Sequence, residues 1–168
     1  MSTGQAQAGQ RYRRFIVMVL VSTLLMFGLM YLNTYAASHL FFSQTRMWMA
    51  LLMGAAMALL MLAFMHGMYS NGRANLLIVV VCLLTFGVAL WLVRSQRTVD
   101  DVAYMKAMIP HHSIAILTSR RARIVDPRVR ELADGIIATQ EREIARMEAL
   151  IADLEDQRQT ATQAAEKR

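Results

Sequence analysis

Three apolar runs without a charged side chain constrain this chain more than any other feature. Each is roughly as long as the ~20 residues that a helix needs to cross a bilayer core. The connections between them are short, and one contains the turn pair Asn71-Gly72, so neighbouring helices are expected to run antiparallel. We therefore predict a three-helix transmembrane region over residues 15–93, with spans at residues 15–36, 47–65 and 74–93.

The charged residues divide the chain at about residue 100. Residues 1–99 hold seven Arg and no Asp or Glu, whereas all twelve acidic residues lie at or beyond Asp100. The part from Asp100 to Arg168 has eleven basic and twelve acidic residues, so the net charge of +6 belongs to the membrane-flanking half. This near-neutral soluble part argues against nucleic-acid binding, which a basic total charge would otherwise suggest.

Basic residues near the span ends predict the orientation. Arg11, Arg13 and Arg14 precede the first span, whose apolar core is longer than that of a cleaved signal peptide, so we expect an uncleaved anchor. Such a cluster usually faces the cytoplasm, and an odd number of spans then puts the C-terminal part on the other side. We expect a multi-pass protein of a bacterial-type inner (cell) membrane, with residues 1–14 cytoplasmic and the C-terminal domain extracytoplasmic.

After the third span the pattern changes to that of amphipathic helices. Thr98 and Asp101 have the spacing of a capping box, which predicts a helix from about Val99 to Val125. Asp126 followed by Pro127 predicts a second start, with Asp as N-cap and Pro at the first helical position. The two helices would form an antiparallel hairpin.

The hairpin is expected to occupy residues 98–156, with the second helix ending at about Asp156 and a polar tail over residues 157–168. Two helices alone bury too little apolar surface to be stable. We therefore predict an all-α fold in which two copies of the hairpin pair into a four-helix bundle, or in which the hairpin packs on the membrane face.

Alternating steps of three and four residues predict the faces that the hairpin helices turn toward each other. These faces comprise Val102, Met105, Ile109, His112, Ile116 and Ser119 on the first helix, and Val129, Ala133, Ile136, Gln140, Glu143, Met147, Leu150 and Leu154 on the second. Folding the hairpin at Asp126 is expected to put His112 opposite Gln140, Ile109 with its neighbour Met108 opposite Glu143, and Met105 opposite Met147. Buried imidazole, amide and carboxylate groups each cost several kcal/mol if unpaired, so they must bond one another, bind water or coordinate something.

Pro110 lies within the first hairpin helix, where it removes the hydrogen bond to the Lys106 carbonyl and is expected to kink the helix. Four potential soft or borderline metal ligands surround it: Met105, Met108, His111 and His112. Thioether and imidazole together suit copper, whereas zinc usually takes Cys or carboxylate beside His. Spacing leaves an alternative equally open, a polar layer of His112, Gln140 and Glu143 that sets the helix register while methionines fill the core.

Several short motifs of the hairpin occur together in this chain. They are Tyr-Met-Lys-Ala-Met-Ile-Pro-His-His at residues 104–112, Ala115-Ile116, Asp126-Pro127, Leu132-Ala133, and Ile137-x-x-Gln140-x-x-Glu143-Ile144-x-x-Met147. Over about residues 100–154 the sequence resembles the family catalogued as domain of unknown function 305, which is ferritin-like and helical and includes periplasmic copper-binding proteins. The resemblance implies four ligand candidates with two near neighbours: His111, His112, Met108 and Met147, beside Gln140 and Glu143.

We therefore expect a membrane-anchored, extracytoplasmic metal-binding protein that sequesters or transfers a copper ion through a Met/His cluster. Its expected partners are the lipid bilayer, the copper ion and a second copy of the chain. We expect no enzyme, because nothing resembles a nucleophile with its base, a phosphate loop or a dinucleotide fingerprint. The alternative is a structural or interaction module without metal, in which the hairpin dimerises and the spans anchor it.

Overall fold

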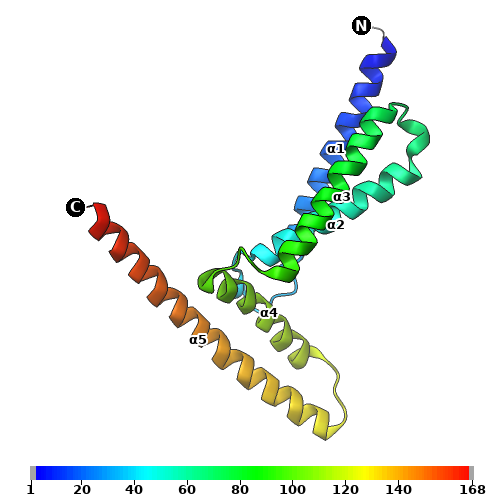
Figure 1. Cartoon of the computed structure of the whole chain (residues 1–168). Coiled ribbons are helices and arrows are strands. Elements are labelled where there is room, and N and C mark those ends of the chain that lie inside the picture. Colours follow the sequence, from blue (N-terminus) through cyan, green and yellow to red (C-terminus); the bar gives the residue numbers. More distant parts are fainter. Residues whose placement is uncertain (1–2, 167–168) are drawn as a thin grey trace. The chain divides into compact units, whose positions relative to one another are not determined.

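The structure is a computed structural model that describes residues 3–166 of the chain, with side chains described for residues 9–165. Within residues 3–166 it is all-helical (Figure 1). The elements, in chain order, are α1 (Thr3–Leu29), the 3-10 helix η1 (Ala37–His39), α2 (Gln44–Phe64), the 3-10 helix η2 (His66–Met68), α3 (Gly72–Ser95), α4 (Asp101–Arg121) and α5 (Pro127–Glu166).

The chain divides into two compact units. The first contains the residues up to Met30 together with Thr45–Thr98, and the second contains Tyr31–Gln44 together with the residues from Val99 onward. Two short pieces of the expected terminal segments, residues 1–2 and 167–168, lie outside the described residues.

Three helices of the first unit are long and apolar enough to cross a membrane, as the sequence predicts: Gly9–Leu29, Gln44–Phe64 and Gly72–Ser95. The second and third lie within three residues of the expected bounds. The first helix ends at Leu29 rather than at about Ala36, because the residues that follow pack in the second unit. The Asn71 side chain caps α3 by accepting from the amides of Arg73 and Ala74.

Small residues bring α1 and α2 close together. The buried side of α2 includes Ala50, Gly54 and Ala58 at steps of four. A Cβ atom at Gly54 would overlap the side chain of Thr23 on α1. Helices in lipid gain much of their association energy from such close backbone approach, because lipid tails supply no hydrophobic drive between them.

Aspartates start both hairpin helices. Asp126 caps α5 as predicted, since its Oδ1 accepts from the Arg128 amide at 2.9 Å and Pro127 is the first helical residue. At the start of α4 the expected capping box is wrong: the N-cap is Asp100, whose Oδ1 accepts from the Ala103 amide at 2.8 Å. Thr98 cannot cap, because it lies in the turn between α3 and α4.

The helix α5 is nearly twice as long as α4 and extends past the N-terminal end of α4 (Figure 1). It continues beyond the expected end at about Asp156 to Glu166, whereas α4 ends at Arg121 instead of Val125. The residues after Asp156 lack a core-facing pattern but include many strong helix formers such as Gln, Ala and Arg. The absence of a core-facing pattern predicts that these residues do not pack against another element. A segment that packs against nothing can still form a helix.

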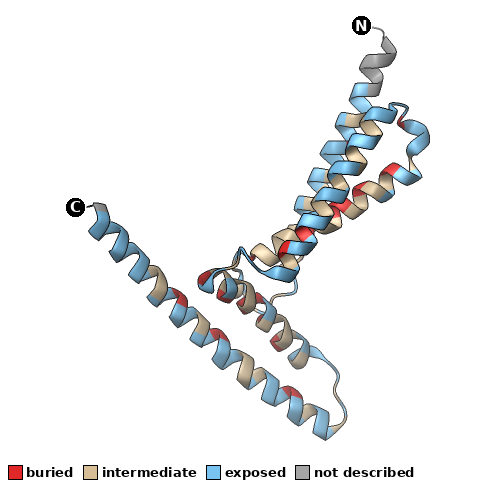
Figure 2. Ribbon diagram, in the orientation of Figure 1, coloured by how far each residue is buried: buried red, intermediate tan, exposed pale blue. Residues whose placement is uncertain are grey.

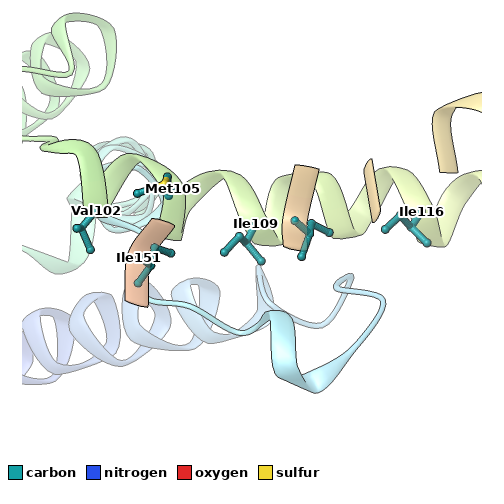
Figure 3. Packing of buried hydrophobic residues seen from close by; sticks show 6 residues of the cluster. Val102, Met105, Ile109, Ile116 and Ile151 are labelled. Atoms are coloured by element: carbon teal, nitrogen blue, oxygen red, sulfur yellow. The ribbon is translucent and has the colours of Figure 1, made fainter. Parts of the chain in front are cut away.

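The core of the second unit lies between α4 and α5. Four residues of α4 (Val102, Met105, Ile109 and Ile116) and two of α5 (Ile144 and Ile151) form it, and Figure 3 shows this row. Ile109 is 0% exposed. Figure 2 shows that the buried residues of α5 lie on its side toward α4. Full burial of such a side chain contributes about 1.5–3 kcal/mol.

The face that α5 turns to α4 differs from the expected one at alternate positions. The observed face runs through Ala133, Ile137, Gln140, Ile144, Met147, Ile151 and Leu154, all buried or partly buried. The other expected positions are exposed instead: Val129, Ile136, Glu143 and Leu150. Both sets repeat in steps of three and four or of seven, so spacing fits either one, and the packing against α4 selects between them.

The connection between α1 and α2 is part of the hairpin unit. The Tyr35 amide donates to Oγ of Ser113 at 2.7 Å, and His39 Nδ1 lies 2.9 Å from the same oxygen. Phe41 packs against the α4/α5 core. Arg120 lies over the Tyr35 ring and donates to its hydroxyl at 2.6 Å. The helix α4 is therefore covered by α5 on one side and by this connection on another.

A candidate metal-binding hollow

An open hollow of about 540 Å³ lies along α4 and α5. It is lined by Asp101, Tyr104, Met105, Met108 and His112 of α4, and by Glu143, Arg146, Met147, Leu150 and Leu154 of α5. Most of these positions are three or four residues apart, the spacing that puts side chains on one helix face. Five of the seven site residues expected from the sequence therefore meet in one place: Met105, Met108, His112, Glu143 and Met147.

His112 is oriented by one contact on each ring nitrogen. Nδ1 lies 3.0 Å from the carbonyl oxygen of Met108, and Nε2 lies 2.8 Å from Oε2 of Glu143. A backbone carbonyl that accepts from Nδ1–H fixes the ring and leaves Nε2 as the nitrogen that can bind a ligand. The carboxylate of an ionised Glu143 is also an acceptor, so the ring donates to both neighbours only when both nitrogens carry a proton.

Two expected site residues lie elsewhere. His111 is exposed and does not line the hollow; its ring centre is 6.3 Å from that of His112. Gln140 lines a separate shallow depression with Leu132 and Ile136. The expected pair of His112 with Gln140 is therefore wrong, because His112 meets a residue three positions farther along α5.

The direction of helical side chains explains this difference in register. Each Cα–Cβ bond leans toward the N-terminus of its own helix. In an antiparallel hairpin, side chains of α4 therefore lean away from the turn and those of α5 lean toward it. Contacts thus form with residues farther along α5 than simple folding predicts, as the pairs Lys106–Glu155 and Arg120–Glu141 also show, at 2.6 and 2.5 Å.

Three thioethers and one imidazole line the hollow beside two carboxylates and a phenol. Among residues 9–165, no three His, Cys, Asp or Glu side chains come together in a way that could hold a metal ion. A metal in this hollow would depend on methionine sulfur beside His112. Met105 is buried, whereas Met108 and Met147 are half-buried. Thioether and imidazole donors fit Cu(I), whereas Ca²⁺ takes about six to eight oxygen ligands and the hollow offers two carboxylates, Asp101 and Glu143.

The sequence did not identify five residues of the hollow as part of the site: Asp101, Tyr104, Arg146, Leu150 and Leu154. Tyr104 lies one turn before Met108, and Arg146 and Leu150 follow Glu143 at helical spacing. Tyr104 resembled an ordinary surface residue, and Leu150 resembled a core residue. The spacing of Tyr104, Met108 and His112 at steps of four was the signal that they share a face.

Comparison with known proteins gives a family match over the hairpin and a match to one protein over part of the chain. Residues 101–168 match the family described as "Domain of unknown function (DUF305)". The chain is also similar to "Uncharacterized protein L153" of Acanthamoeba polyphaga mimivirus, with 32% identity over 106 residues, covering 62% of this chain and 68% of that protein. No solved structure matches the chain. The family match begins at the first residue of α4 and includes every residue that lines the hollow.

Proposed function

The chain belongs to the family described as Domain of unknown function (DUF305), and from that premise we propose that its hairpin is a metal-binding module for copper on a membrane anchor. One observation carries the proposal: Met105, Met108, Met147 and His112, from two helices, line a single hollow. In a single copy the hollow is open, so an ion could enter it from a donor or leave it to an acceptor. This access suits sequestration or transfer.

The residues that would hold the ion are the three methionines and Nε2 of His112. Methionine sulfur carries no proton, so among these groups only the imidazole competes with protons for the metal. Glu143 would release Nε2 when the ion binds. It would then remain as a neighbouring negative charge that offsets the charge of the cation.

We also propose that the hairpin lies outside the cytoplasm of a cell with a bacterial-type inner membrane. The basic cluster before α1 supports this orientation. Two membrane-length helices, α2 and α3, lie between the α1–α2 connection and α4. When both cross the bilayer, the connection and α4 lie on the same side of it. The packing of Tyr35 and His39 on Ser113 requires that arrangement.

Pairing of two hairpins into a four-helix bundle belongs to the same proposal. A hairpin with one interhelical core leaves large apolar side chains in water, such as Leu132 at 64% and Tyr104 at 55% exposure. Bundles of four helices bury such side chains on the second face of each helix.

The test is Cu(I) binding by the full chain in nanodiscs, without oxygen, in competition with a chromophoric Cu(I) chelator. We expect the Met108→Leu, His112→Ala variant to bind at least tenfold more weakly, because it loses a sulfur and the imidazole. His111→Ala is the matched control, since it removes a neighbouring imidazole outside the hollow, and it should retain wild-type affinity. Equal affinity of wild type and the double variant would reject the site.

A second function, a structural module without metal, is favoured by the contact between His112 and Glu143. These two side chains satisfy each other at 2.8 Å without an ion. A chain that binds no Cu(I), yet loses thermal stability on His112→Ala and not on His111→Ala, would support this function over copper binding.

A further inference from the structure

The helix α5 carries a second apolar stripe that nothing within residues 9–165 covers fully. Val129, Leu132, Ile136 and Leu150 are 48%, 64%, 37% and 43% exposed. Ile136 and Leu150 directly precede the core-facing residues Ile137 and Ile151. One residue corresponds to about 100° of helical rotation, so the stripe lies about a quarter turn from the face on α4.

Two apolar faces about a quarter turn apart are what a helix needs to contact two neighbours in a four-helix bundle. Among the residues that the structure describes, α5 has one such helical neighbour, α4. The same open side continues onto α4, where Tyr104 is 55% exposed and lines the hollow together with Leu150. We call the residues Tyr104, Val129, Leu132, Ile136 and Leu150 the second face.

We propose that a second copy of this hairpin packs on the second face, so that the hollow becomes enclosed between the two copies. This inference rests on the pairing proposed above and not on metal binding. It adds the surface through which the copies pair, and it puts the Met/His cluster at the interface between them.

Opposite charges beside the second face favour an identical partner. Glu143 and Arg146 are three residues apart, and both line the hollow. If two α5 helices cross antiparallel about a twofold axis between these positions, Glu143 of each copy lies opposite Arg146 of the other. Interfaces between identical copies require this kind of self-complementarity, because one patch must fit itself.

The enclosed hollow would also contain more ligands than one chain supplies. A single copy offers one His and two carboxylates there, Asp101 and Glu143, beside the methionines. A twofold axis near Glu143 brings the equivalent His112 and Glu143 of the second copy to the same interface. Enclosure would remove water from the donors, which strengthens their electrostatic interactions.

The test is the mass of the full chain in nanodiscs, measured by native mass spectrometry with a chelator present so that copper plays no part. We expect wild type to be a dimer and Ile136→Lys, Leu150→Lys to be a monomer with unchanged helicity by circular dichroism. Ala138→Lys, Ala152→Lys is the matched control, because these exposed residues lie two positions farther on, on the opposite side of α5. It should remain a dimer.

Cross-linking gives a second measurement that does not depend on how the lysine variants fold. Cys82 is the single cysteine, so Cys82→Ser provides a background for Leu150→Cys or Ala152→Cys. A bismaleimide should link Leu150→Cys into dimers in membranes and leave Ala152→Cys monomeric. A monomeric wild type would overturn both the pairing and this surface. A dimeric wild type that both lysine variants preserve, with equal cross-linking at the two positions, would overturn the surface alone.

Discussion

Ser113 on α4 contacts His39, 74 residues earlier in the chain, with Oγ lying 2.9 Å from Nδ1. The same oxygen accepts the amide proton of Tyr35 at 2.7 Å, and Ser113 is 0% exposed. One hydroxyl therefore satisfies two groups of the α1–α2 connection at a buried position. The connection is held as part of the hairpin unit by this residue.

Replacement of Ser113 by Ala should release the connection. It leaves the Tyr35 amide and the His39 ring without their partner, and a buried unsatisfied polar group costs about 1–3 kcal/mol. Hydrogen exchange of the Tyr35 amide in the full chain should accelerate at least fivefold. Ser119→Ala on the same helix is the control and should leave that exchange rate unchanged; equal acceleration in both variants would contradict the role of Ser113.

Gly54 should tolerate no side chain while Thr23 is present. Gly54→Ala puts a Cβ against the Thr23 side chain, and such overpacking typically costs about 1–3 kcal/mol. We expect a lower Tm of the full chain in detergent, restored in part by Thr23→Ala in the double variant. Gly87→Ala is the control, because its Cβ would meet nothing within 4 Å. Failure of Thr23→Ala to restore the Tm would show that the two helices do not meet there.

The stability of the hairpin should fall in acid. The Ala103 amide and the Arg158 guanidinium lower the pKa of Asp100, and Arg128 lowers the pKa of Asp126. Each carboxylate therefore stabilises the fold above its unfolded-state pKa of about 3.9 and loses that contribution as pH falls through its lower folded pKa.

The measurement is the Tm of the full chain between about pH 2 and about pH 7, a range that brackets the unfolded-state pKa of about 3.9. Asp100→Asn should flatten the fall in Tm below about pH 4, and it should keep most of the stability at pH 7 because Asn is also a good N-cap. Asp156→Asn removes the same charge at a position away from either helix start. It should leave the fall in Tm at acid pH as in wild type. If the Tm falls equally at acid pH in Asp100→Asn and in wild type, the proposed contribution of the Asp100 cap to stability is excluded.

Ile109 should be the most costly single truncation in the hairpin. It is 0% exposed between α4 and α5, and Ile→Ala at such sites costs about 2–5 kcal/mol. Val125→Ala, at a residue that is 92% exposed, should change stability by less than about 0.5 kcal/mol. Chemical denaturation of the full chain in detergent distinguishes the two, and similar losses would mean that the hairpin core lies elsewhere.

Most helix positions followed from local signals. Uncharged runs marked the three spans, and Asp126 with Pro127 marked the start of α5, because these signals act within one helix. The cap of α4 was missed, since Thr98 and Asp100 both precede acceptable starts and only the turn after α3 distinguishes them. The length of α5 was missed because its last residues have helix propensity without a packing pattern.

The sequence by itself determined that uncharged helices precede a hairpin and that methionines, a histidine and a glutamate share its faces. Spacing and charge are sufficient for that, since they depend on residues close together in the chain. Only the tertiary structure decided that His112 meets Glu143, that Gln140 and His111 lie outside the hollow, and that Ser113 holds His39. Those contacts depend on which of two stripes α5 turns inward and on the lean of its side chains. Both are properties of the packed helix pair.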